Sequence, residues 1–95
     1  MTYRDKGTRD IALGVNSKAA RSKLPVALHK NAREKMAYLQ NSESLDDLRA
    51  WRGLNLHPLD RDRKGQHSIW INGPYRICFK WTARGAEDVE IVNYH

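Results

Sequence analysis

Hydrophobic positions change their spacing once along the chain, near Gly53. Between residues 24 and 40 they recur every three or four positions, which predicts an amphipathic helix. Lys30, Arg33 and Lys35 fall largely away from this stripe, so we expect the helix to pack on a sheet and to keep a solvated basic back. The stripe consists of Leu24, Leu28, Ala32, Met36 and Leu39.

Shorter elements are expected before this helix. A short edge strand is expected around Tyr3. A brief helix over residues 8–13 has Thr8 as its predicted N-cap and is expected to end at Gly14. Residues 16–23 are small, polar and basic, which predicts a loop or a linker between helices.

A second short helix is expected after Ser44, which supplies a capping hydroxyl. Asp46 and Asp47 then place carboxylates where the helix dipole favours negative charge. We expect this helix to end near Gly53 and Trp51 to pack at the edge of the core.

From residue 54 onward the period becomes two, which is typical of β-strands. Leu54 is expected to begin a strand that ends at His57. Residues 68–72 alternate cleanly, with hydrophobic side chains at 69 and 71 on one face. Asn72-Gly73-Pro74 is typical of a tight turn and predicts a hairpin into a strand over residues 75–81.

The last two strands are expected to share their faces. After the hairpin, Arg76, Cys78 and Lys80 alternate with apolar residues and therefore face away from the helices. After a second turn, the last strand places Tyr94 on the face of Arg76. Asn93 falls on the core phase, which predicts an indirect role. The core-facing residues are expected to be Tyr75, Ile77, Phe79, Trp81, Val89 and Ile91.

Together these elements predict an α+β fold in which N-terminal helices pack on one face of a small antiparallel β-sheet. Ninety-five residues are too few for two cores, so residues 1–95 are expected to form a single domain. No apolar run approaches the roughly 20 residues of a membrane-spanning helix, and the first residues lack the apolar part of a secretory signal. The single cysteine suits the reducing cytoplasm, which is the expected location.

Lysine and arginine outnumber aspartate and glutamate 17 to 11, which gives a net charge of +6. On so small a protein this charge favours a polyanionic partner through steering and counterion release. An acidic protein would be attracted by the same field, so charge alone leaves RNA and protein partners open.

The histidines and arginines of the second half suit metal-free cleavage of RNA. That reaction needs one group to take the 2′-OH proton, one to neutralise charge on phosphorus, and one to protonate the leaving 5′-oxygen. Histidine transfers protons near neutral pH, and arginine binds phosphate through paired hydrogen bonds. We therefore expect Arg76 to stabilise the scissile phosphate, His57 and His95 to share the acid and base roles in either order, and Tyr94 to orient the nucleotide.

Other residues of this half could bind the substrate. The basic loop over residues 61–64 is expected to bind phosphate. His67 either lines the same groove or is simply exposed, and Trp70 either stacks on a base or packs. The expected RNA-binding residues are Arg61, Arg63, Lys64, His67, Trp70 and Lys80.

Neither a nucleophilic cysteine nor a metal site is expected. Cys78 lacks a catalytic Cys–His spacing and suits a small filler, and His29 is expected to be structural or solvated. The histidines and the cysteine lack the paired spacing of zinc ligands, so no metal and no cofactor is expected.

The segment LHPLDRDRKGQHSIWINGPYRICFKW, followed by DVEIVNYH, resembles the HigB branch of the RelE-like toxins. The resemblance implies a RelE-like fold and a ribosome-dependent mRNA endonuclease of a type II toxin–antitoxin pair. It implies catalytic roles for His57, Arg76, Asn93, Tyr94 and His95.

Two residues depart from the family pattern. Asn93 replaces the acidic residue of the terminal motif; its carbonyl can accept a hydrogen bond from an imidazole but cannot stabilise an imidazolium by charge. Asp60 stands where some relatives have a lysine, and Arg61 next to it could replace that cation.

The resemblance also implies partners. These are mRNA in the ribosomal A site, ribosomal RNA, and a HigA-like helix-turn-helix antitoxin through which the toxin reaches operator DNA. The alternative is a weak or inactive module that binds RNA or antitoxin and acts as a transcriptional co-repressor. A purely structural partner of a transcription factor is the third class.

Overall fold

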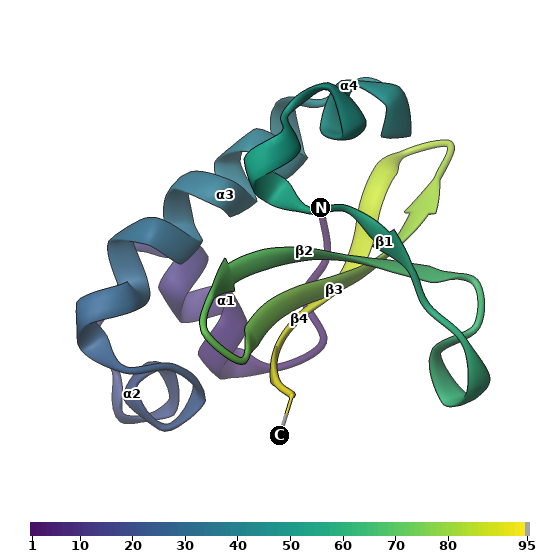
Figure 1. Cartoon of the computed structure of the whole chain (residues 1–95). Helices are drawn as coiled ribbons and strands as arrows, with labels where there is room; N and C mark the ends of the chain where they lie inside the picture. The colour runs from purple at the N-terminus through teal and green to yellow at the C-terminus, as the bar shows by residue number, and fades with distance from the viewer. Residues whose placement is uncertain (95) are drawn as a thin grey trace.

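Four α-helices and a four-stranded antiparallel sheet make up the computed structural model, which describes residues 1–94 (Figure 1). The helices are α1 (Lys6–Leu13), α2 (Lys18–Lys23), α3 (His29–Asn41) and α4 (Leu45–Ala50). The strands, in their order across the sheet, are β1 (His57–Pro58), β2 (Gln66–Asn72), β3 (Tyr75–Thr82) and β4 (Gly85–Asn93). Helices α1 and α3 pack against the sheet, which confirms the predicted α+β fold. No helix of residues 1–94 is long and apolar enough to cross a membrane.

The first helix begins earlier than predicted, and Thr8 is not its cap. The carboxylate of Asp5 accepts from the Thr8 backbone N–H at 2.7 Å and is therefore the N-cap. The Thr8 hydroxyl is buried and accepts from the Ile91 backbone N–H at 3.1 Å, which ties α1 to β4. The helix ends as predicted at Gly14, in the left-handed conformation (φ 78°).

The predicted loop over residues 16–23 is wrong, because residues 18–23 form α2. Ser17 caps this helix by accepting from the Ala20 N–H at 3.1 Å, and its hydroxyl donates to Asp10 at 2.6 Å. Only Ala20 of the helix is fully buried, so the sequence shows no apolar period there. The helix forms because its cap and its contact with α1 hold it.

The apolar stripe is confirmed within α3, where Ala32, Met36 and Leu39 are buried. The helix does not begin at residue 24 as predicted but at His29, after a 3₁₀ turn over Val26–Leu28. His29 is structural, since its buried ring lies 2.7 Å from the Leu24 carbonyl oxygen. Contrary to the prediction, Lys35 does not lie on a solvated basic face of the helix. It is buried, and its ammonium donates to the Ile71 carbonyl at 3.0 Å.

That bond supplies a donor to a carbonyl that the strand pairing leaves out. Ile71 lies at a register shift of β2 and has no partner residue on β3, and β1 pairs only with His67 and Ser68. The Asn31 amide also donates to the Ile71 carbonyl, at 3.2 Å. A carbonyl without a strand partner needs such donors when a helix lies over it.

The segment from Ser44 to Leu54 agrees with the prediction only in part. Ser44 caps α4 by accepting from the Asp47 N–H at 3.3 Å, as expected. Trp51 does not pack into the core: its side chain is 41% exposed and meets the Tyr38 ring edge-on at 4.7 Å between centroids. Leu54 belongs to a 3₁₀ turn (Arg52–Leu54) and not to a strand.

The sheet follows the period of two. Hairpins with Gly73 and Gly85 at positive φ join β2 to β3 and β3 to β4. The expected strand at Tyr3 is a single parallel bridge to Val89, which covers the outer edge of β4. The core between sheet and helices includes Ile11, Leu24, Met36, Leu48, Ile69, Ile71, Ile77, Phe79, Val89 and Ile91.

Replacement of Gly7 by alanine should destabilise the fold, because a Cβ there would lie 2.6 Å from the Ala19 carbonyl oxygen. Helix propensity alone favours alanine by up to about 1 kcal/mol. Overpacking against backbone costs about 1–3 kcal/mol, so we expect a net loss of unfolding free energy by urea titration. The exposed α2 position Ser22→Ala is the control, and a more stable Gly7→Ala protein would contradict the contact.

Candidate active site

The face of the sheet that points away from the helices, here called the outer face, carries the candidate site. Directly paired residues of antiparallel strands point to the same face. One row of paired residues crosses all four strands and consists of His57, Ser68, Cys78 and Glu90. The neighbouring row consists of Trp70, Arg76 and Val92.

Arg76 lies at the centre of this face and is held from two sides. Its Nε donates to the Ser68 hydroxyl at 2.7 Å, and its Nη2 donates to the Asn55 carbonyl at 2.7 Å. Nη2 also lies 3.5 Å from the Ser68 carbonyl oxygen, whereas Nη1 makes no hydrogen bond within residues 1–94. Burial lowers the pKa of Arg76, and the guanidinium still remains charged at neutral pH. A partly desolvated cation with unused donors is suited to bind a phosphate.

Tyr94 lies on the same face as Arg76, as predicted. Its hydroxyl is 3.5 Å from the Cys78 sulfur, and 42% of the residue is exposed. Burial raises the pKa of Tyr94, and the contact with Cys78 raises it further. Cys78 itself is fully buried, and burial raises the pKa of its thiol, which fits the predicted filler.

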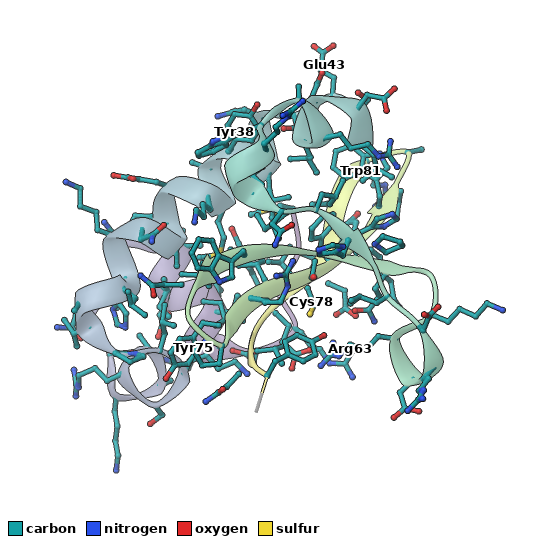
Figure 2. All side chains as sticks on the ribbon, viewed as in Figure 1. Tyr38, Glu43, Arg63, Tyr75, Cys78 and Trp81 are labelled. Atoms are coloured by element: carbon teal, nitrogen blue, oxygen red, sulfur yellow. The ribbon has the colours of Figure 1, made fainter. Side chains whose placement is uncertain are left out.

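Arg63 reaches back from the loop between β1 and β2 to the outer face, on the side of Cys78 (Figure 2). Its Nη1 lies 3.0 Å from a Glu90 carboxylate oxygen and 3.3 Å from the Gln66 side-chain oxygen. Burial alone would lower the pKa of Arg63, but the hydrogen bond to Glu90 raises it above its usual value. Arg63 therefore fastens the loop to β4.

Glu90 also belongs to the site, although the sequence predicted no role for it. Besides Arg63, its carboxylate lies 3.8 Å from Arg4 and 3.9 Å from Lys23. The period of two already placed Glu90 on the outer face, and that phase was the available signal. Cations from three parts of the chain thus meet at this carboxylate, and the pairing with Arg63 holds the loop in place.

The histidines of the predicted site differ in placement. His57 is exposed in β1 and pairs with Ser68, the residue that accepts from Arg76. His95 lies outside the described residues. Asn93 is exposed at the end of β4 and pairs with Tyr75. This pairing agrees with the core phase expected for Asn93, because Tyr75 packs against the core. Its side chain is nevertheless exposed, because the strand ends at that residue.

The other predicted RNA-binding residues lie around this centre. Arg61 and Lys64 are exposed in the loop, and Lys80 is exposed on β3. Trp70 is 38% exposed; its indole N–H donates to the Gly73 carbonyl at 3.0 Å, and the Lys35 ammonium lies 5.3 Å from the ring. One side of the indole is thus fixed by the protein.

His67 is not brought to the outer face. It pairs with Phe79 on the side of the helices and stacks on that ring at 6.2 Å between centroids. The prediction that it lines the groove therefore has no structural support. Its Nδ1 is buried without a hydrogen-bond partner among residues 1–94, and burial, with the charge of Arg49, lowers the pKa of His67.

The family comparison covers nearly the whole of this arrangement. The model of a family described as RelE-like toxin of type II toxin-antitoxin system HigB matches residues 12–95. No curated protein matches the chain. The matched range includes every outer-face residue of β1 to β4, and it confirms the resemblance found in the second half of the sequence.

The lowered pKa of His67 makes stability depend on pH. The folded protein favours the neutral imidazole. The contribution of His67 to the free energy of unfolding is therefore fully present above the unfolded pKa of about 6.5, and it is lost as the pH falls through the lower folded pKa. His67→Leu should therefore lose less stability than the wild type between pH 7.5 and pH 5, as measured by urea titration. Equal pH slopes for the two proteins would refute this account of His67.

Proposed function

The chain belongs to the HigB-like family of RelE-like type II toxins, and from this premise we propose that it is a ribosome-dependent mRNA endonuclease that needs no metal ion. The observation that carries the proposal is the Arg76 guanidinium, which is fixed on an open sheet face with unused donors. Family membership implies an antitoxin partner. We propose a HigA-like helix-turn-helix protein for that partner, and the cytoplasm, where ribosomes work, as the location.

The proposed reaction is attack of the 2′-oxygen on the neighbouring phosphorus. A base takes the 2′-OH proton, the new P–O bond forms, and the P–O5′ bond breaks as an acid protonates the 5′-oxygen. His57 and His95 are proposed to share these roles. Arg76 stabilises the charge that develops on the phosphoryl oxygens, and Tyr94 orients the nucleotide. The products are a 2′,3′-cyclic phosphate and a 5′-hydroxyl.

Asn93 leaves this site with one negative charge fewer than a terminal motif that has an acidic residue at this position. It is neutral, so an imidazolium beside it gains no charge pairing from its side chain. The nearby carboxylate of Glu90 is already engaged by Arg63, Arg4 and Lys23. We propose Asn93 as an indirect, orienting residue.

Substrate binding is assigned to the loop and to the edges of the outer face. Arg61 and Lys64 are exposed and offer their charges to mRNA or ribosomal RNA. Trp70 offers one open aromatic face for base stacking. Lys80 adds a cation on β3, whereas Arg63 contributes through its pairing with Glu90.

The alternative function is a binding module that represses transcription together with its antitoxin and does not cut RNA. The neutral Asn93 is the observation that favours it. Expression in a host without the antitoxin separates the two: growth arrest with cleaved transcripts supports the nuclease, and harmless accumulation supports the binding module.

Arg76→Ala and His95→Ala should each suppress cleavage of translated mRNA, mapped by primer extension after induction. Loss of one preorganised charge donor costs about 10²–10³-fold in rate, so Arg76→Ala should also abolish growth arrest. Arg84→Ala, which removes an exposed arginine from the β3–β4 turn, is the charge-matched control and should retain full activity. Full cleavage by both Arg76→Ala and His95→Ala would overturn the assignment.

The double change Arg61→Gln and Lys64→Gln should weaken RNA binding equally for all sequences. The slope of log affinity against log salt should fall by about 1.4, at about 0.7 per lost phosphate contact with single strands. The helix-layer pair Lys18→Gln and Lys30→Gln removes the same charge and should leave the slope unchanged. An unchanged slope for the loop variant, or no RNA retention by the wild type, would exclude phosphate binding there.

A further inference from the structure

A residue in the left-handed conformation lies two positions before the start of β1 and contacts the centre of the candidate site. Asn55 has φ 52° and ψ 55°, and its N–H donates to the Arg52 carbonyl at 3.0 Å. Among residues with a side chain, asparagine tolerates this conformation best. The consequence of the conformation is that the Asn55 carbonyl accepts from Arg76 Nη2 at 2.7 Å.

The two short hydrogen bonds of Arg76 use one edge of its guanidinium. Ser68 takes Nε and Asn55 takes Nη2, both at 2.7 Å. A planar guanidinium held at two nitrogens cannot rotate about its side-chain bonds. Both N–H groups of Nη1 are left for an acceptor that residues 1–94 do not supply.

We propose that Asn55 is a positioning residue: its left-handed backbone aims a carbonyl that sets the plane of the Arg76 guanidinium, so that Nη1 faces the scissile phosphate. The inference rests on the proposed nuclease function. The same bond fastens the segment that carries His57 two residues later. Because β1 is only two residues long, this bond helps to keep His57 at a fixed separation from Arg76.

Backbone conformation, and not the amide side chain, is what the proposal requires of Asn55. Asn55→Gly keeps the carbonyl and permits the same φ, whereas Asn55→Val opposes it because a β-branched residue rarely adopts positive φ. Asn55→Ala, with a single Cβ, is the milder variant and keeps the test valid if the valine protein folds poorly.

The experiment compares cleavage of translated mRNA by purified proteins on ribosomes. Asn55→Gly should cleave within about twofold of the wild type, Asn55→Val about 10–100-fold more slowly, and Asn55→Ala at a rate between them. The loss should appear in kcat with KM unchanged, because the loop that binds RNA is intact. Thermal unfolding should show all variants folded at the assay temperature.

A double change separates positioning from a merely structural role. In an Arg76→Ala background, Asn55→Val should cause no further loss of cleavage, because it acts through Arg76. Multiplying losses, or a valine variant that cleaves like the wild type while Arg76→Ala is inactive, would overturn the role of Asn55 alone. If Arg76→Ala cleaves normally, or the wild type does not cleave, the proposed function falls and this inference falls with it.

Discussion

The arrangement depends on one partly buried cation that must keep its hydrogen bonds. Removing a guanidinium from water is unfavourable unless acceptors replace the lost solvent. For Arg76 these acceptors come from two other parts of the chain, the Ser68 hydroxyl on β2 and the Asn55 carbonyl before β1. The β2–β3 register and the position of the 52–58 segment are therefore coupled. A chain that misplaced either one would leave the charge partly unpaired.

The same constraint explains why the basic loop is not simply a free cluster of cations. Arg63 is committed to Glu90, and Glu90 also faces Arg4 and Lys23. This pairing reduces the number of cations that can bind phosphate, but it orders the loop against β4. Arg61 and Lys64 remain exposed and are carried by a segment whose base is fixed. Arg63 thus orders the loop, whereas Arg61 and Lys64 are available to bind phosphate.

Much of the outer face could be predicted from alternation alone. The period of two placed Arg76, Cys78 and Tyr94 together, and the structure agrees. The same alternation places His67 on the core-facing side with Ile69, so the sequence itself argued against a position for His67 in the RNA-binding groove. Sequence phase is reliable here because one face of the strands must be buried.

The missed features have a different physical origin. Helix α2 carries almost no apolar period, and Lys35 is buried because an unpaired carbonyl of β2 needs a donor. The Asn55 contact involves a backbone oxygen, which no pattern of side chains reports. Such features depend on how elements meet in space, and residue types along the chain do not encode them locally.

The candidate site lies on an open sheet face, and this position favours a polymeric substrate over a small ligand. A small ligand needs a concave pocket that removes most of its surface from water. On the outer face, Trp70 lies on β2, Arg76 on β3 and Tyr94 directly after β4, and all three are partly open to solvent. A polynucleotide can contact such a face with several successive units, each through a phosphate or a base. Under the proposed function, the ribosome that holds the mRNA supplies the specificity that such an open face lacks.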